Sequence, residues 1–287
     1  MMSELKNTVF VNGEFVSANE AKVSAFDRGF IFGDGIYEVV PVLNSKMVDK
    51  AEFWQRFERS MSEIELKLPY SHVEFEKILQ GIITKNELKE GGIYMQITRG
   101  SAPRDFKFLS GLAPTIFIFC YEAQIINNPL AKSGINVVSV PDIRWKRRDI
   151  KSISLLAQCW AKNEAAKQDA FEAIMVENGL VSEGSSSSIF IIKDDILITK
   201  PLSNEILPGI RRKNLLEFAD KIGLKAELRD FTIDEVYKAD EAFISAATLI
   251  LLPIVKADKH LINGGQIGKY TKQLRQLYEQ KFINEAK

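Results

Sequence analysis

Lys151 is the first residue of the chain whose type and position could carry covalent chemistry. It follows a basic stretch and stands just before a predicted apolar helix. A lysine amine can attack an aldehyde when its surroundings keep it reactive. Most lysines on basic loops are simply solvated, so the role of Lys151 depends on partners elsewhere in the chain.

Three further features supply such partners. Glu183 precedes a run of four serines between two apolar segments, where a tight hydroxyl-lined turn can hold a carboxylate. The segment Leu207-Pro208-Gly209-Ile210-Arg211 opens a predicted helix, so the amides of Ile210 and Arg211 can bind an anion such as phosphate. Arg56 offers a guanidinium from an amphipathic helix. Each feature also has a plainer interpretation, namely a polar loop, an ordinary helix start and an exposed helix arginine.

Taken together, these groups match the needs of pyridoxal phosphate. The cofactor requires an amine for its aldehyde, a carboxylate for its ring nitrogen, and positive groups or free amides for its phosphate. Spacing alone makes this a suggestion, because nothing in it brings the residues together.

The elements that would position these residues divide at a linker. Residues 125–134 lose all periodicity and contain turn formers, so we place the linker there, between domains at 1–124 and 135–287. The elements expected before it are a hairpin at 8–16, strands at 36–43, 93–98 and 115–121, and helices at 53–64 and 71–88, the helical part ending at Gly91-Gly92. Those expected after it are strands at 135–140, 173–176, 189–192 and 196–199, and helices at 155–168, 211–223 and 269–286. This predicts an α+β chain in two domains, a smaller N-terminal α/β domain and a larger, strand-rich, barrel-like C-terminal domain.

Composition excludes several classes of function. The 287 residues carry 38 Lys plus Arg and 38 Asp plus Glu, so no net charge favours nucleic acid or an anionic membrane. Four cations between Arg144 and Arg148 are expected to form a solvated turn. Two cysteines and two histidines predict neither a disulfide framework nor a metal site. The first six residues lack a signal pattern, and the apolar stretch 242–255 is too short to span a bilayer, so we expect a cytoplasmic protein.

Four ordered motifs resemble those of the class IV, or fold type IV, pyridoxal phosphate aminotransferases. The motifs are Phe26 to Glu38, Asp142 to Ser152, Glu183 to Ser187, and Leu207 to Arg211. Within that family the chain is most similar to the D-amino acid aminotransferases. The resemblance implies a pseudo-barrel as the larger domain and pyridoxal phosphate as the cofactor.

The resemblance also implies a role for individual residues. Lys151 would hold the cofactor as an internal aldimine and shuttle a proton, and Glu183 would keep the pyridine nitrogen protonated. Tyr37 and Arg104 would bind the substrate carboxylate, Arg104 from the other subunit of a homodimer. The residues implied at the cofactor, mainly its phosphate, are Arg56, Ser187, the amides of Ile210 and Arg211, and Thr248.

The chain departs from the family pattern at three places. Phe106 replaces a histidine of the carboxylate trap, so Arg104 would act alone or with Arg28 or Lys107. Ser188 stands where the family usually has asparagine. Ala246-Ala247 replaces residues with hydroxyls, so backbone amides or Thr248 would contribute more to binding the phosphate.

Three activities are compatible with these residues. The first is transfer of an amino group from a D-amino acid such as D-alanine to 2-oxoglutarate or pyruvate, which Arg104 favours. The second is a branched-chain L-amino acid or (R)-amine transaminase, which Phe106 would allow. The third is a lyase of the aminodeoxychorismate type, which would release pyruvate without an amino acceptor.

Overall fold

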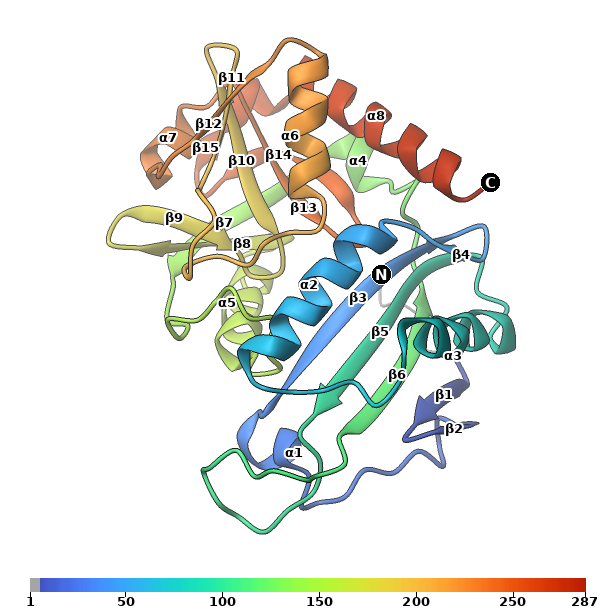
Figure 1. Ribbon diagram of the computed structural model, residues 1–287. Coiled ribbons are helices and arrows are strands. Elements are labelled where there is room, and N and C mark those ends of the chain that lie inside the picture. Colours follow the sequence, from blue (N-terminus) through green and yellow to red (C-terminus); the bar gives the residue numbers. More distant parts are fainter. Residues whose placement is uncertain (1–5) are drawn as a thin grey trace. The chain divides into compact units, whose positions relative to one another are not determined.

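The computed structural model describes residues 6–287, and the chain falls into two compact units (Figure 1). The first unit contains the chain up to Gln124 together with Ile150–Ser154 and Ile283–Lys287. The second contains Ile125–Asp149 and Leu155–Phe282. The expectation that the chain lacks a signal sequence rests largely on residues 1–5, which lie outside the described residues.

Across the described residues, none of the helices has both the length and the apolar character needed to cross a bilayer.

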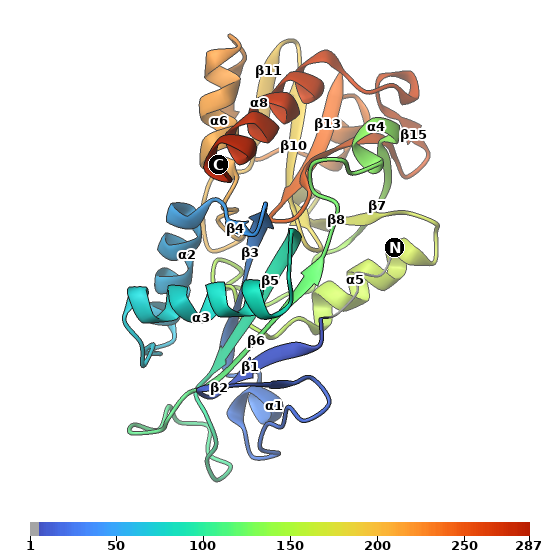
Figure 2. The ribbon, with the colours of Figure 1, turned by 90° about the vertical axis from the view of Figure 1, so that its right-hand side faces the viewer.

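A six-stranded antiparallel sheet forms the first unit, in the order β2-β1-β6-β5-β3-β4. The predicted hairpin is confirmed, with Asn12 and Gly13 at positive φ in its turn. Two helices cover one face of this sheet (Figures 1 and 2). The elements are β1 (Thr8–Val11), β2 (Glu14–Ser17), α1 (Arg28–Phe32), β3 (Gly35–Leu43), β4 (Lys46–Met47), α2 (Lys50–Glu63), α3 (His72–Lys85), β5 (Glu90–Thr98) and β6 (Thr115–Glu122).

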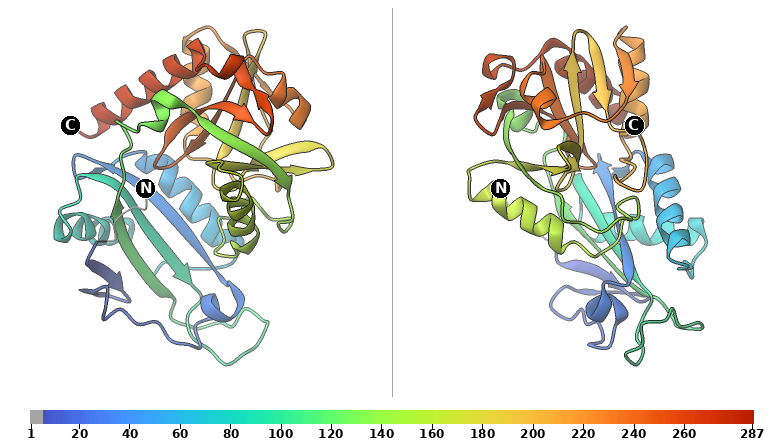
Figure 3. Two further views of the ribbon diagram at one scale, coloured as in Figure 1. Left: turned by 180° about the vertical axis from the view of Figure 1, so that it is seen from behind. Right: turned by 90° about the vertical axis from the view of Figure 1, so that its left-hand side faces the viewer.

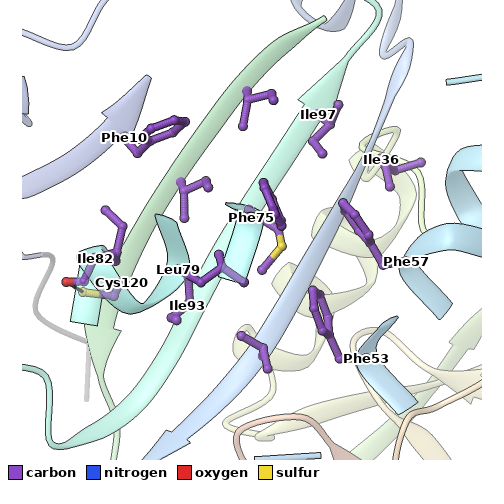
Figure 4. Packing of buried hydrophobic residues seen from close by; sticks show 14 of the residues in the cluster. Phe10, Ile36, Phe53, Phe57, Phe75, Leu79, Ile82, Ile93, Ile97 and Cys120 are labelled. Carbon is purple, nitrogen blue, oxygen red and sulfur yellow. Dashed lines mark hydrogen bonds between the residues drawn. The ribbon is translucent and has the colours of Figure 1, made fainter. Parts of the chain in front are cut away.

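The core of the first unit lies between the sheet and the two helices (Figure 4). Phe53 and Phe57 of α2 and Phe75 of α3 are almost completely buried and stack in sequence, within a cluster that also contains Ile36 and Ile93. The helical spacing of these aromatic residues is what buries them on one face. The predicted capping box is confirmed at the start of α3, where Ser71 and Glu74 satisfy each other's backbone amides.

The segment Ile150–Ser154 belongs to the first unit although 25 residues of the second unit precede it. It runs antiparallel beside the start of β3, where the Tyr37 amide donates to the Lys151 carbonyl at 3.0 Å and the Ile153 amide to the Gly35 carbonyl at 3.1 Å. This backbone pairing places Lys151 against the six-stranded sheet, and no pattern in the neighbouring sequence predicts it.

The second unit is built on a curled nine-stranded sheet (Figure 3). Its order is β12-β11-β10-β13-β14-β7-β8-β9, with β15 paired to β14. Its strands are β7 (Ile135–Pro141), β8 (Glu172–Glu177), β9 (Leu180–Gly184), β10 (Ser188–Lys193), β11 (Ile196–Thr199), β12 (Lys225–Leu228), β13 (Glu241–Ala246), β14 (Ile250–Ala257) and β15 (His260–Leu261). Its helices are α4 (Leu130–Ser133), α5 (Leu156–Ala166), α6 (Arg212–Lys221), α7 (Ile233–Tyr237), the 3₁₀ turn η1 (Ile262–Gly265) and α8 (Lys269–Glu285), whose end joins the first unit.

Two sequence expectations differ from this structure. Residues 125–134, predicted to be a linker, belong to the second unit, and Leu130–Ser133 form α4. Gly91 and Gly92 do not end a helix but lie in β5, which begins at Glu90. A Cβ atom at Gly91 would stand 2.0 Å from the Tyr121 carbonyl oxygen, so glycine is required there by the close approach of β6.

Candidate active site

Lys151 lies over the ring of Tyr37, in the first unit. Its Nζ atom is 4.1 Å from the ring centroid. Its backbone is held on both sides, because the Lys151 amide donates to Ser60 Oγ of α2 at 3.2 Å and its carbonyl accepts from the Tyr37 amide. Tyr37 in turn stacks on Tyr94 with ring centroids 5.6 Å apart. The backbone hydrogen bonds and the contact with the aromatic ring together restrict the positions that the Lys151 amine can occupy.

Arg56 is buried rather than exposed, and it forms a two-pronged ion pair with Glu38. Its Nε and Nη2 atoms donate to the two carboxylate oxygens at 2.6 and 2.7 Å, and the Glu38 side chain is 0% exposed. The plain interpretation of an exposed helix arginine is therefore wrong. Glu38 is a charged partner that sequence reasoning did not find, although it ends the first motif.

Arg104 extends from an exposed loop between β5 and β6. Its guanidinium carbon lies 4.9 Å from the ring centroid of Phe106 and 5.6 Å from that of Phe32. Arg28 is buried beside it, pairs with Asp34 at 2.7 Å, and donates to the Asp105 carbonyl. The structure thus brings Phe106 against Arg104, and Arg28 anchors the backbone of their loop.

Glu183 is the centre of a buried charge network in the second unit. Arg144 donates to it from Nη1 and grips Asp142 with Nε and Nη2 at 3.0 and 2.7 Å. The Leu207 amide approaches the Glu183 carboxylate at 3.2 Å. Burial raises the pKa of Glu183, an effect that the Arg144 guanidinium opposes. Burial would also raise the pKa of Asp142, but hydrogen bonds from Arg144 and Ser182 lower it overall.

The serine run after Glu183 is a structured turn around a second carboxylate. Glu172, at 0% exposure, accepts hydrogen bonds from Ser185, from Ser186 at 2.9 Å and from Ser187 at 3.1 Å. The Ser187 hydroxyl donates its hydrogen to Glu172. Ser187 could therefore contact a cofactor only through its backbone or by accepting a hydrogen bond at its side-chain oxygen. Sequence reasoning missed Glu172, which lies outside every motif.

Two backbone segments of the second unit have the character of an anion site. The first is the start of α6, where Ile210 is buried and Arg211 is the residue before the first helical turn. A Cβ atom at Gly209 would stand 2.7 Å from Ser188 Oγ, so a side chain there would displace that hydroxyl. The second segment is the half-buried turn between β13 and β14 that contains Thr248. The Arg211 side chain joins the two segments, since its Nε donates to the Ala246 carbonyl at 2.8 Å.

The basic cluster is not uniformly solvated, which corrects the sequence expectation. Lys146 is 75% exposed as expected, but the side chains of Arg144 and Arg148 are 5% and 1% exposed. Arg148 pairs with Glu177 at 2.6 Å and with Asp142 at 3.2 Å. Acidic residues at both ends of the cluster and on β8 and β9 were the available signal for this burial.

The predicted residues therefore form two groups. Lys151, Tyr37, Arg28, Arg56, Arg104 and Phe106 belong to the first unit, and Glu183, Ser187, Ile210, Arg211 and Thr248 to the second. The donor set fits pyridoxal phosphate, because it contains an amine, a buried carboxylate supported by a guanidinium, and helix-start and turn amides for a phosphate. Across the described residues, no group of His, Cys, Asp or Glu is arranged to hold a metal ion.

Comparisons with known proteins agree with this fold and donor set. The model of the family "Amino-transferase class IV" matches residues 35–257. The D-alanine aminotransferase of Staphylococcus aureus is 40% identical over 272 residues, covering 94% of this chain and 96% of that protein. That of Bacillus licheniformis is 34% identical over 97% of this chain and 98% of its own length. The branched-chain amino acid aminotransferase of Escherichia coli has a similar structure, with a TM-score of 0.88 at 23% identity over 98% of this chain and 96% of that chain.

The two units and their contents define an α+β enzyme of fold type IV. The chain belongs to the class IV aminotransferases. Pyridoxal phosphate, the cofactor of that family, is therefore its cofactor.

Proposed function

We propose that the protein is a D-amino acid aminotransferase, which moves the amino group of a D-amino acid such as D-alanine to pyruvate or 2-oxoglutarate. The observation that carries this proposal is the 40% identity, over nearly the whole of both chains, to a D-alanine aminotransferase. The donor set of the two units supports it, because each group that amino transfer requires has a residue of suitable chemistry.

Lys151 is the residue we assign to covalent and proton chemistry. When bound, pyridoxal phosphate supplies an aldehyde for the amine and an electron-poor ring that stabilises negative charge at the substrate Cα. Lys151 would hold that aldehyde through its Nζ atom, and the same atom would carry the proton of the substrate Cα. The Tyr37 ring, 4.1 Å from Nζ, limits the directions from which the amine can act.

Glu183 is assigned to the ring nitrogen. A carboxylate beside this nitrogen keeps it protonated, which strengthens the electron-withdrawing character of the ring. Burial raises the pKa of Glu183, and the Arg144 guanidinium opposes that rise and so favours the ionised carboxylate. The phosphate is assigned to Arg56, the amides of Ile210 and Arg211, and the turn that contains Thr248.

The substrate carboxylate is assigned to Arg104, with Tyr37 as a second donor. The Phe106 ring below the guanidinium holds it by a cation–π contact in place of a hydrogen bond, which leaves the fork of Arg104 available for a carboxylate. The experiment is to compare Arg104→Gln with Lys67→Gln, an exposed cation of the first unit to which no role is assigned. Loss of kcat/KM for D-alanine in the first variant alone supports the assignment, and equal activities contradict it.

We also propose a homodimer that works in the cytoplasm. Phe26, Phe30 and Phe106 are 67%, 80% and 74% exposed. Exposed aromatic side chains of this kind are typical of a surface that another protein chain covers. Cys120 and Cys159 are both free thiols, as suits a reducing compartment. Sedimentation of the purified protein at two concentrations tests the dimer.

A branched-chain L-amino acid transaminase is the second candidate, because Phe106 makes the loop more apolar than a histidine would. The deciding experiment follows the absorbance of the purified, cofactor-loaded protein while D-alanine or L-leucine is added without an acceptor. Conversion of the lysine-bound band to that of the aminated cofactor by D-alanine alone supports the D-amino acid proposal. Conversion by L-leucine alone moves the assignment to branched-chain substrates, and release of pyruvate without an acceptor moves it to a lyase.

The same spectra test Lys151. The Lys151→Arg variant keeps the positive charge but cannot link to an aldehyde under these conditions, so we expect its bound cofactor to lack the lysine-bound band. Wild-type absorbance in that variant would contradict the role given to Lys151.

A further inference from the structure

The turn between β13 and β14 is held from its inner side by two buried arginines from different helices. Arg211, at the start of α6, donates to the carbonyls of Ala246 and Ala247. Arg275, on α8, donates from Nη1 to the carbonyls of Leu249 and Leu251 at 3.0 and 2.6 Å. The two guanidiniums are 1% and 7% exposed as whole residues, so these bonds are made in the interior.

The placement of the two arginines is itself fixed. Arg211 lies 4.8 Å from the ring centroid of Tyr278 and 4.4 Å from that of Phe282, both on α8. Arg275 also donates from Nη2 to the Ile125 carbonyl at 2.7 Å, and its Nε pairs with Glu279 at 2.6 Å. Helices α6 and α8 lie side by side over this part of the second unit (Figures 1 and 2).

Because the peptide group is planar, these hydrogen bonds to carbonyls also determine where the neighbouring amides point. In a trans peptide, the carbonyl of one residue and the amide of the next point in opposite directions. Because the carbonyls of Ala246 and Ala247 face Arg211, the amides of Ala247 and Thr248 face away from it. The amide of Ile250 is not among the outward ones, because Ile250 pairs with Ala246 at the end of the β13–β14 ladder.

A local hydrogen bond from the Leu249 amide to the Ala246 carbonyl at 3.1 Å closes the turn, but the conformation of Ile250 needs further contacts. Ile250 has φ of 60°, which is strongly disfavoured for a β-branched residue and persists only where surrounding contacts impose it. Ser245 Oγ donates to the Ile250 carbonyl at 2.7 Å, and Arg275 donates to the carbonyls of Leu249 and Leu251 on both sides of it. The contacts that hold Ile250 in this conformation are therefore the Arg275 guanidinium and this serine.

The two guanidiniums are also close enough to affect each other electrostatically. Burial lowers the pKa of Arg275, Glu279 opposes this effect, and the charge of Arg211 lowers it further. Keeping two cations together in the interior costs free energy, which an anion bound on the outer side of the turn would offset. The turn thus joins outward amides to a positive interior.

We propose that Arg275 is a positioning residue for the cofactor phosphate, acting through the carbonyls of the β13–β14 turn together with Arg211. This inference rests on the proposed function, in which that turn binds the phosphate of pyridoxal phosphate. Its consequence is that the terminal helix α8, which contains no residue assigned to catalysis, sets the affinity for the phosphate.

The test compares two ligands that differ only in the phosphate. Cofactor-free wild type, Arg275→Met and Arg275→Lys are titrated with pyridoxal phosphate and with pyridoxal, and the bound phosphate is followed by phosphorus NMR. We expect Arg275→Met to bind pyridoxal phosphate roughly tenfold or more weakly, because two charge-assisted hydrogen bonds to the turn are lost. Its affinity for pyridoxal should stay within about twofold of wild type, since the turn is assigned to the phosphate alone. Arg275→Lys should fall between.

Leu274→Ala is the matched control on α8. Leu274 is 0% exposed and apolar, so its truncation lowers Tm without removing a bond to the turn. The ratio of the two affinities should stay at the wild-type value in this variant. If Arg275→Met keeps the wild-type ratio of the affinity for pyridoxal phosphate to that for pyridoxal, the proposal is overturned. If the Met variant does not fold, the same result in Arg275→Lys overturns it. A wild type that binds both ligands equally would instead contradict the proposed phosphate site.

Discussion

The network around Glu183 predicts how much free energy of unfolding the Arg144→Met variant loses and how this loss depends on pH. Arg144 bridges two carboxylates whose side chains are 0% and 7% exposed. When it is removed, Asp142 keeps Arg148 at 3.2 Å, whereas Glu183 keeps the Leu207 amide as its partner. One buried charge is thus left without a cation. Breaking a buried pair in this way costs about 3–5 kcal/mol of the free energy of unfolding at pH 7.

The loss depends on pH with a definite sign. The pKa of Glu183 is already raised by burial, and loss of Arg144 raises it further. Since the folded state then binds the proton more tightly than the unfolded state, the variant loses stability as pH rises from the unfolded pKa, about 4.3, through the folded pKa. The gap between wild type and variant should therefore be largest at neutral pH and should narrow toward pH 4.

Urea unfolding of the cofactor-free protein, followed by circular dichroism at several pH values, measures this gap. The matched control is Lys146→Met, which removes the same charge from a side chain that is 75% exposed and paired with Glu177. Its cost should be about 0–1 kcal/mol at every pH. If Arg144→Met costs no more than Lys146→Met, or if its cost does not change with pH, the assignment of a buried, charge-dependent network is refuted.

Two further predictions concern the first unit, each measured by thermal unfolding. Gly100 has φ of 95°, and a Cβ atom there would stand 2.0 Å from the Ala113 carbonyl oxygen. Gly100→Ala should therefore lower the free energy of unfolding by at least about 2 kcal/mol. Gly111→Ala is the control, and because Gly111 has φ of 76° but open space around it, its cost should be about 1 kcal/mol. Equal costs would mean that the loop shifts to accept the new atom. Ser71→Ala should cost about 1 kcal/mol by removing the cap of α3, and no change would show that Glu74 caps the helix alone.

The sequence by itself determined the elements that depend on local chemistry. The hairpin at Asn12-Gly13, the capping box at Ser71 and the apolar face of α2 follow from backbone preferences and helical spacing, which act within a few residues. The four motifs likewise identified the family, because their residue types and order are specific. Lys151 and Glu183 were therefore candidates before any fold was known.

The tertiary structure alone decided which charges are buried and what they pair with. Glu38, Glu172 and Arg275 lie far in the sequence from the residues they hold, so no spacing relates them. The pairing of Ile150–Ser154 with β3 is equally non-local. A buried charge is stable only where the fold brings an opposite charge or a carbonyl to it, and that meeting depends on the packing of whole elements rather than on neighbours in the chain.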